Sequence, residues 1–292
     1  MNQRIALIGA GRMGSALATA LHDKGFDTTV WNRTSSKAEA LSRLGLRVAP
    51  SLLQAVSNAE IVIVNIKDYE ATRQLVRQLA VESALRGKVF VQLSSGTPDE
   101  AREMESWARR LGVDYLDGAI VNYPADIGKP QGTVLYSGSE ELFLRVKPAL
   151  LAFGDNAMFV GKEIGQASAT DIALLSFFTG TMLGFIQGHV VYEAENLPGE
   201  GYLQIIKSLM PALDAALTDI CRRIRAKDYS DPQATLDTWT VAPRELIAWC
   251  KQHRVDHSFA DPQLMLMNRA IDAGKGQADF AYLYEVLKQG AD

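Results

Sequence analysis

The stretch that most constrains the fold of this chain lies near its amino-terminal end, at residues 4–37. The apolar run IALI at residues 5–8 leads into the glycine-rich sequence GAGRMG at residues 9–14. Small and apolar residues then recur at helical spacing until Gly25, and a second short strand is expected at residues 28–31. This order of strand, glycine turn, helix and strand is half of a dinucleotide-binding unit. A purely structural turn is the alternative, but the complete context favours a nucleotide site.

Each glycine of the turn has an expected mechanical role. Gly9 permits the tight turn, Gly11 lets the backbone approach a pyrophosphate, and Gly14 lets the helix pack close to the strand. The first helical residues, Arg12 and Met13, stand where unpaired N–H groups and a partial positive charge face the phosphates. We therefore expect these five residues to bind the cofactor.

The residues after the second strand indicate which dinucleotide binds. NAD-binding chains usually carry an acidic residue about 20 positions beyond the turn, where it accepts hydrogen bonds from the ribose. This chain instead has Asn32, Arg33 and Thr34, with Lys37 one turn into the next helix. A carboxylate would repel a 2′-phosphate, whereas a guanidinium, a hydroxyl and an ammonium would bind it. The pattern predicts NADP; the alternative is a solvated arginine and lysine at a helix start.

Composition excludes several classes of protein. The 292 residues, 47% hydrophobic and 22% charged, are typical of a soluble globular protein with one large or two ordinary domains. A net charge of −4 argues against a nucleic-acid or membrane-surface partner. Cys221 and Cys250 form no CxxC pair and no export signal is evident, so we expect reduced thiols and a cytoplasmic protein. His253 and His257 lack further metal-ligand residues at suitable spacing, so we expect surface histidines and no metal.

Strand and helix patterns alternate through the first half of the chain. The fold class predicted is α/β, with an amino-terminal Rossmann-type, doubly wound parallel sheet. Ligands of such sheets bind at the carboxyl ends of the strands, where we expect Ile66, Ser95 and Asn122. The further expected strands lie at residues 60–66, 88–93, 113–121, 133–137 and 157–160, and the helices at residues 35–44, 68–79, 99–111 and 140–151.

Helical periodicity replaces this alternation in the second half. We place the boundary near Glu163, which gives a dinucleotide-binding Rossmann domain at residues 1–162 and a helical dimerisation and substrate domain at residues 163–292. The all-α domain is expected to be built on a long interdomain helix. Later helices are expected at residues 202–226, 234–254, 262–273 and 278–289.

The first helix of the second half has an unusual composition, because residues 172–192 contain no charge. Its length is compatible with a membrane span. Polar residues such as Gln187 and His189, three glycines and the lack of a second such segment argue against a span. A helix that is apolar all round must be buried all round, and one small domain can hardly bury it. We therefore expect a homodimer whose interface contains this helix; an ordinary core helix is the alternative.

The glycine turn, together with Asn32, Arg33, Thr34 and Lys37, resembles the NADP-dependent imine reductases. Their relatives, the β-hydroxyacid dehydrogenases, share the architecture. The sequences DGA at residues 117–119, YPADIG at residues 123–128 and LYSG at residues 135–138 are also similar to the imine reductases. The resemblance extends over nearly the whole chain.

The discriminating stretch is residues 161–175. In the hydroxyacid dehydrogenases a lysine stands at the position of Asp171 and substrate-binding asparagines follow, whereas Leu174 and Leu175 follow here. An ammonium group would be a like charge beside a C=N⁺ substrate in a partly dry cavity. A carboxyl there can stabilise the iminium or relay a proton to its nitrogen while NADPH gives hydride to the carbon. The resemblance thus implies that Asp171 is catalytic; the alternative is an aspartate that caps the long helix.

The resemblance also implies a substrate pocket formed by two subunits. Reductive aminases carry an asparagine at the position of Ser95 and a tyrosine at that of Thr179, so this chain is less similar to them. Plain core packing is the alternative for each pocket residue. The pocket residues implied are Asn122 and Tyr123, with Phe178, Met182 and Trp239 from the partner subunit.

The sequence therefore predicts an NADPH-dependent reductase of cyclic imines or iminium ions, with active sites shared between the subunits of a homodimer. Two alternatives stay open. One is a β-hydroxyacid or carbonyl dehydrogenase with an atypical acid–base residue. The other is an NADP-binding sensor without turnover.

Overall fold

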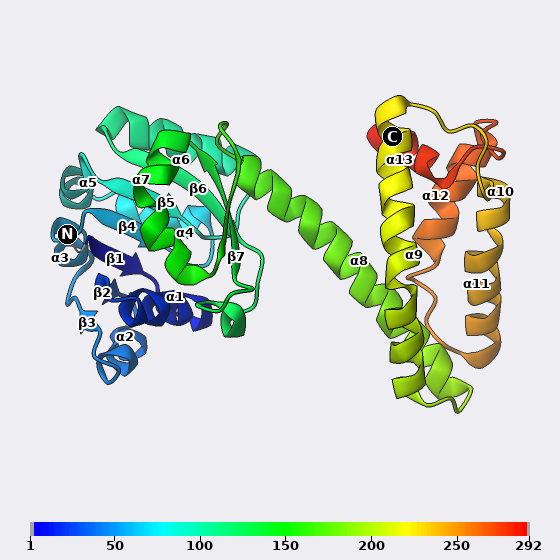
Figure 1. Ribbon diagram of the computed structural model, residues 1–292, viewed down its shortest axis with the longest axis horizontal. Coiled ribbons are helices and arrows are strands. Elements are labelled where there is room, and N and C mark those ends of the chain that lie inside the picture. Colours follow the sequence, from blue (N-terminus) through cyan, green and yellow to red (C-terminus); the bar gives the residue numbers. More distant parts are fainter. Residues whose placement is uncertain (1–2, 291–292) are drawn as a thin grey trace. The chain divides into compact units, whose positions relative to one another are not determined.

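The computed structural model describes residues 3–290 and divides into two compact units, Met1–Phe177 and Phe178–Asp292. The first unit is built on a sheet, and the second is helical (Figure 1). Each unit has its own apolar core. The division falls inside one continuous helix, α8 (Gln166–Ala194).

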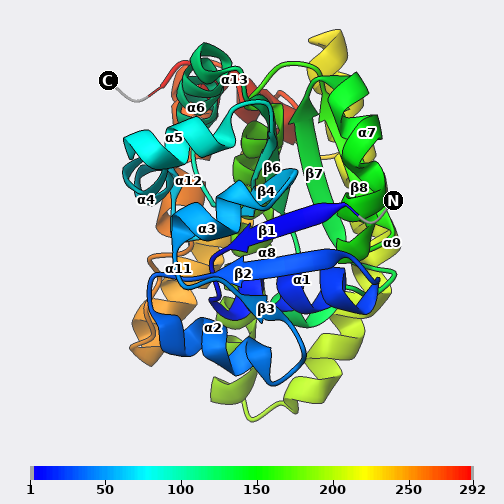
Figure 2. The same ribbon diagram turned by 90° about the vertical axis from the view of Figure 1, so that its left-hand side faces the viewer.

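The first unit contains an eight-stranded sheet with the order β3-β2-β1-β4-β5-β6-β7-β8. Strands β1 to β6 are parallel, β6 pairs antiparallel with β7, and β7 pairs parallel with β8. Figure 2 shows the β3-β2-β1 end of this sheet beside α1 and α2. The strands are β1 (Arg4–Ile8), β2 (Asp27–Trp31), β3 (Arg47–Val48), β4 (Ile61–Val64), β5 (Val89–Gln92), β6 (Asp114–Ile120), β7 (Thr133–Gly138) and β8 (Asn156–Gly161).

The predicted α/β fold with a doubly wound sheet is confirmed, with one correction. Strands β7 and β8 run against the other six, although the alternating pattern predicted a wholly parallel sheet. The connection between β6 and β7 holds only the short 3-10 turn η1 (Pro124–Asp126). A parallel crossover usually needs a helix, and without one β7 returns antiparallel.

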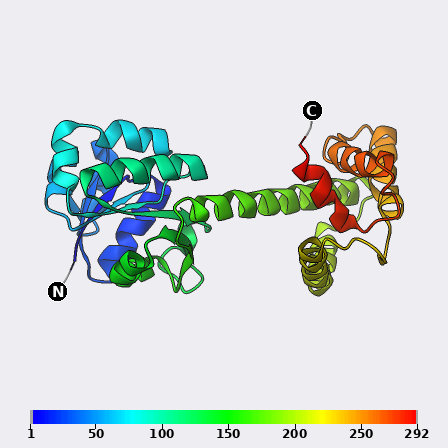
Figure 3. The ribbon, with the colours of Figure 1, turned by 90° about the horizontal axis from the view of Figure 1, so that it is seen from above.

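Helices cover both faces of the sheet, as Figure 3 shows from above. Alternate residues of β1 enter different cores, with Ile5 and Leu7 on one face and Ala6 and Ile8 on the other. The sequence did not predict β3, α3 or α5, whose two to seven residues are too short to establish a period. The first face carries α1 (Arg12–Asp23), α2 (Ser35–Ser42) and α7 (Glu140–Leu150), and the second carries α3 (Leu52–Ser57), α4 (Tyr69–Val76), α5 (Leu79–Leu85) and α6 (Pro98–Leu111).

The second unit is all-α, as predicted. The single helix expected at residues 234–254 is wrong: Thr240 separates α10 from α11, and Pro243 supplies no N–H for the helical ladder. Here His257 pairs with Asp261, and His253 lies against the carbonyl of Trp249. Its elements are the rest of α8, then α9 (Gly199–Ala226), α10 (Leu236–Trp239), α11 (Val241–His253), α12 (Asp261–Asp272), η3 (Phe280–Tyr282) and α13 (Leu283–Lys288).

Helix α8 is buried only at its start. Ala167 and Ser168 are buried against the sheet, whereas Leu175, Leu183 and Ile186 are 51, 54 and 57% exposed. Among the described residues it is the one helix long and apolar enough to cross a membrane by length and composition. The burial on all sides that its composition predicts is therefore not provided within one chain.

Candidate active site

The glycine turn follows β1, and two of its glycines are required by the protein itself. Gly9 has φ = +114°, and a Cβ there would lie 2.0 Å from the carbonyl oxygen of Asn65. A Cβ on Gly14 would lie 2.2 Å from the carbonyl oxygen of Gly9, so only glycine lets α1 start this close to the turn. Gly11 differs, because a Cβ there would meet no protein atom within 4 Å and its φ is an ordinary −70°. Nothing in the protein requires glycine at this position, but the close approach of a pyrophosphate would.

A pocket of about 390 Å³ opens beside this turn. It lies where α1 and α2 begin and where β2 and β4 end. Neither helix start is capped by its own side chain, at Gly11 for α1 or Thr34 for α2, so backbone N–H groups remain available to anions. The lining residues are Gly9, Gly11, Arg12, Met13, Trp31, Asn32, Arg33, Thr34, Lys37, Asn65, Ile66, Lys67, Ala71 and Leu75.

Asn32 holds the turn in place. Its side-chain Oδ1 accepts a hydrogen bond from the Ala10 N–H at 2.9 Å, and its Nδ2 donates to the Thr34 carbonyl at 2.8 Å. The side chain thus ties the glycine turn to the start of α2. Both ends of its amide are used within the protein, so Asn32 shapes the pocket wall.

The charged lining of the pocket is basic. Arg12, Arg33 and Lys37 are exposed, and no ion pair between described residues engages them. Lys67, just after β4, adds a fourth cation that sequence reasoning missed; it pairs with Asp68 at 3.4 Å. Its place at the carboxyl end of a parallel strand was the signal that could have found it.

Of the two residues expected at the ends of β4 and β5, only Ile66 lines the nucleotide pocket. Ile66 lines the pocket, and its N–H donates to Ser94 Oγ at 3.0 Å. Ser95 is exposed at the end of β5 and lies outside the pocket lining, as does Gly14, which packs beneath the turn. Ser94, which sequence reasoning passed over, therefore joins the two strand ends.

Asp171 lies in the second turn of α8. The helix begins at Gln166, so the alternative that Asp171 caps it is wrong. The side chain is half-buried. Burial, and then the nearby carboxyl of Asp117, raise the pKa of Asp171 above its usual value. Carboxyl groups with a raised pKa are typical of functional sites.

The residues predicted for the substrate pocket are distributed over both units. In the first unit, Asn122 Oδ1 accepts from the Thr133 N–H and closes the loop between β6 and β7, while Tyr123 is exposed. Phe178, Met182 and Trp239 belong to the second unit, where all three are exposed.

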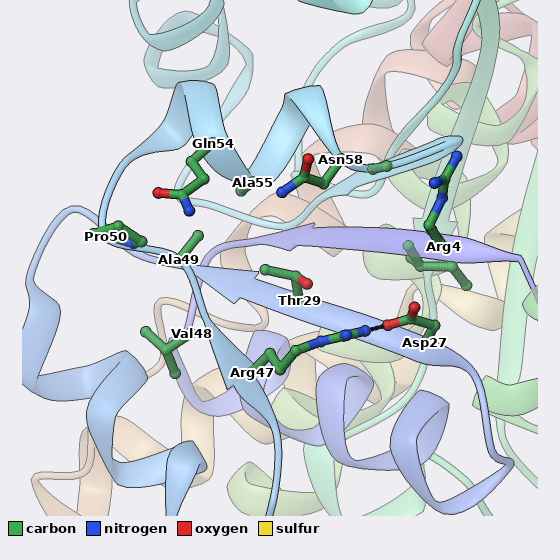
Figure 4. Close-up of a pocket in the computed structure, with 12 residues that line it drawn as sticks. Arg4, Asp27, Thr29, Arg47, Val48, Ala49, Pro50, Gln54, Ala55 and Asn58 are labelled. Carbon is green, nitrogen blue, oxygen red and sulfur yellow. Dashed lines mark ion pairs between the residues drawn. The ribbon is translucent and has the colours of Figure 1, made fainter.

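A second depression, of about 400 Å³, lies on the side of the sheet where the parallel strands begin, opposite the nucleotide pocket (Figure 4). It is formed beside α3 at the amino-terminal ends of β1 and β2, with Arg4 and Thr29 in its wall. Arg47 and Asp27 pair across it. Ligands of open parallel sheets bind at the other edge, so this depression is no part of the nucleotide site.

Two family models together match nearly the whole chain. The NAD binding domain of 6-phosphogluconate dehydrogenase matches residues 4–161, and the C-terminal domain of the NADPH-dependent reductive aminase-like proteins matches residues 163–289. The change of family thus falls before α8, while the packing units divide within it. The whole of α8 belongs to the second matched domain.

Individual relatives match over the full length. An imine reductase from Myxococcus stipitatus, solved with NADP⁺, is 40% identical over 97% of this chain and 99% of its own, with a TM-score of 0.92. A reductive aminase from Aspergillus terreus, solved with NADPH and ethyl levulinate, is 29% identical over 98% and 100% of the two chains, with a TM-score of 0.90. The NADPH-dependent reductive aminase of Aspergillus oryzae is 29% identical over 99% of each chain.

Fold, site and relatives define an NADP-dependent oxidoreductase with a Rossmann domain and a helical domain. This chain belongs to the imine reductase family, and its cofactor is NADPH. The expected family, enzyme class and cofactor are thus confirmed.

Proposed function

We propose that the enzyme reduces cyclic imines or iminium ions to amines, with hydride delivered to the carbon of the C=N bond. The observation that carries this proposal is the half-buried carboxyl of Asp171 in the second turn of α8. The hydroxyacid dehydrogenases that the chain resembles carry a lysine at this position. A carboxyl stabilises a cationic C=N⁺ group that an ammonium would repel.

The nucleotide pocket supports the cofactor half of this reaction. The turn at Gly9, Gly11 and Gly14 and the start of α1 at Arg12 and Met13 would hold the pyrophosphate. Bound NADPH supplies the hydride. The 2′-phosphate would meet Arg33, Thr34, Lys37 and the uncapped start of α2, with Ile66 and Ser95 placed toward the nicotinamide end.

Asp171 has two chemical options in this reaction. As a carboxylate it stabilises the positive charge of an iminium, and as a carboxylic acid it passes a proton to an imine nitrogen. Because burial raises its pKa, the carboxyl keeps its proton to higher pH than a free aspartate does. Both options require the carboxyl to lie beside the substrate nitrogen.

We also propose that the enzyme is a cytoplasmic homodimer with no nucleic-acid or membrane partner. The apolar, exposed length of α8 supports the homodimer, since a second copy would cover it. In the proposed dimer, residues 1–162 bind the cofactor and residues 163–292 provide the interface. Each site would combine Asn122 and Tyr123 of one subunit with Phe178, Met182 and Trp239 of the partner subunit.

Replacement of Asp171 tests the catalytic proposal. Asp171→Asn should lower kcat with a cyclic imine by about 100-fold, the usual scale of an acid–base residue. NADPH affinity, measured by fluorescence titration, should not change, since Asp171 does not line the nucleotide pocket. Asp155→Asn, at an exposed position in the same unit, is the matched control and should retain wild-type kcat. A loss below about tenfold in Asp171→Asn would remove Asp171 from the mechanism.

A further inference from the structure

A fully buried carboxyl lies at the centre of the first unit and has no part in the function described so far. Asp117, in β6, belongs to the DGA sequence that the nucleotide pocket does not use. Its exposed fraction is 0%. No lysine or arginine contacts it in the part of the chain that the structure describes. A buried carboxyl without a cation is costly unless several donors hold it, so its partners indicate its role.

Three other elements donate hydrogen bonds to Asp117. From α8, Ser168 donates through its N–H at 3.3 Å and through its hydroxyl at 3.1 Å to Oδ2 and 3.2 Å to Oδ1. From the start of α4, the Tyr69 hydroxyl donates to Oδ1. From β7, the Ser137 hydroxyl lies 3.4 Å from Oδ2 and also accepts from the Ala167 N–H at 3.0 Å. All of these partners are buried.

The hydrogen-bonded cluster of Asp117, Tyr69, Ser137 and Ser168 joins α8 to the carboxyl ends of the strands, where the nucleotide pocket lies. The Tyr69 ring packs so closely under the loop after β5 that a Cβ on Gly96 would lie 2.2 Å from its Cδ2. That loop also carries Ser95. At the other side of the cluster, Ser168 precedes Asp171 by three residues, which is about one helical turn on the same face.

We propose that Asp117 is a positioning residue: through Ser168 it fixes the first turns of α8, and its charge acts on the carboxyl of Asp171 one turn further along. This inference rests on the proposed function of Asp171. It assigns to the buried carboxyl a role that helix anchoring alone would not require. A neutral acceptor could anchor α8, but it would not repel the charged form of the Asp171 carboxyl as a second carboxylate does.

The protonation of the cluster supports this inference. Its titratable groups are Tyr69 from α4, Tyr115 from β6, Asp171 from α8 and Asp117 itself. Burial raises the pKa of both tyrosines, so they stay neutral. Burial also raises the pKa of Asp117, and Asp117 in turn raises that of Asp171. Two neighbouring carboxyls without a cation disfavour the doubly charged state.

Three variants separate charge from anchoring. Asp117→Asn removes the charge, and the Tyr69 hydroxyl can turn to accept from the new amide, so the shape of the cluster is retained. Ser168→Ala removes the hydroxyl tether and leaves the charge. Asp114→Asn, on the same strand but at an exposed position paired with Arg145, is the matched control.

The test measures the titration of Asp171 by carbon NMR of labelled aspartate carboxyls, and the pH profile of kcat/KM with a cyclic imine. In Asp117→Asn both midpoints should move to lower pH, by on the order of half a unit to one unit, because a like charge is lost. This direction holds whether the active form of Asp171 is the acid or the carboxylate. In Ser168→Ala kcat should fall several-fold with an unchanged KM for NADPH, and Asp114→Asn should match the wild type.

The inference is overturned if Asp117→Asn folds and the NMR midpoint of Asp171 does not move. If that variant does not fold, Ser168→Ala decides: wild-type kcat in this variant also overturns the inference. Failure of the proposed function looks different, because Asp171→Asn would then retain activity while the NMR midpoint of Asp171 still moved in Asp117→Asn. That result would support the coupling of the two carboxyls and remove only its catalytic consequence.

Discussion

Arg33 is the side chain that we expect to contribute most to the choice of cofactor. It lies in the pocket wall after β2, where NAD-binding proteins usually carry an acid. Its guanidinium is exposed and has no acidic partner among the described residues, so it is available to a phosphate.

Removal of this guanidinium should change cofactor preference. Arg33→Ala should lower kcat/KM for NADPH by about 10- to 100-fold, since a hydrogen bond to a charged group contributes about 1.5–3 kcal/mol. The value for NADH should stay within about twofold, because NADH lacks the 2′-phosphate. Steady-state kinetics with both cofactors measures this, and Arg43→Ala, exposed on the same segment but outside the pocket, is the control. Equal losses with both cofactors would contradict the assignment.

We expect the pH dependence of turnover to follow the titration of Asp171. Burial and the Asp117 carboxyl hold its pKa above the ordinary value of 3.8, so activity should change at a higher pH than a free aspartate would give. Loss of activity above that pKa would identify the acid as the active form, and loss below it the carboxylate. This limb of the pH profile should be absent from the residual activity of Asp171→Asn. Its persistence in that variant would assign the limb to another group.

At the scale of elements, the glycine turn combines two requirements that the GxGxxG pattern does not separate. Gly14 is needed for packing, because α1 starts against the carbonyl of Gly9. A Cβ on Gly11 would meet no protein atom within 4 Å, so we expect the requirement for glycine there to come from the ligand.

Two alanine variants should separate these requirements. Gly11→Ala should leave the Tm of the cofactor-free protein unchanged and weaken NADPH binding at least about tenfold, because the Cβ stands in the path of the pyrophosphate. Gly14→Ala should lower the free energy of unfolding by about 1–3 kcal/mol or more, as overpacking does. Thermal unfolding without cofactor and calorimetric titration with NADPH give the two quantities. Unchanged NADPH affinity in Gly11→Ala would contradict the ligand explanation.

Local signals determined how much of each element the sequence could predict. The strand, turn and first helix were predictable because glycines, apolar runs and helical spacing agree over a short range. The antiparallel direction of β7 was not predictable, since it depends on the absence of a helix from the connection between β6 and β7. The break at Thr240 was missed because the helical period continues on both sides of it, and only Pro243 marks the interruption.

The candidate site was predictable where its residues are adjacent in the sequence. All the expected cofactor residues except Gly14 and Ser95 line one pocket. Ser94 and Asp117 were missed as site residues, because their roles depend on pairing between strands that are distant in sequence. Lys67 was missed although its place after β4 pointed to the site. The partners of Asp117 lie 20 to 51 residues away, which no local pattern records.

At the scale of the whole molecule, α8 carries exposed apolar side chains along most of its length. Exposed apolar positions continue into α9, at Leu203, Ile205 and Leu209. Many exposed apolar side chains on one helix are typical of a permanent subunit interface.

A charge on this surface should dissociate the proposed dimer. Leu183→Glu should shift the protein from dimer to monomer in analytical ultracentrifugation, because a buried carboxylate would have no partner in the interface. NADPH binding should remain and imine turnover should be lost, since the proposed site needs both subunits. Leu79→Glu, at an 84% exposed leucine of α5 in the first unit, is the control and should stay dimeric. A wild-type protein that is monomeric at all concentrations would contradict the shared site.

The most direct test of the proposed imine reduction compares two substrate classes with the purified enzyme, by nicotinamide absorbance. One assay follows NADPH oxidation with pyrroline-type and dihydroisoquinoline-type cyclic imines, and the other follows NADP⁺ reduction with a small hydroxy acid. An imine reductase should turn over the cyclic imines and leave the hydroxy acid unreacted. Turnover of the hydroxy acid alone, or tight NADPH binding with no turnover of either class, would contradict it.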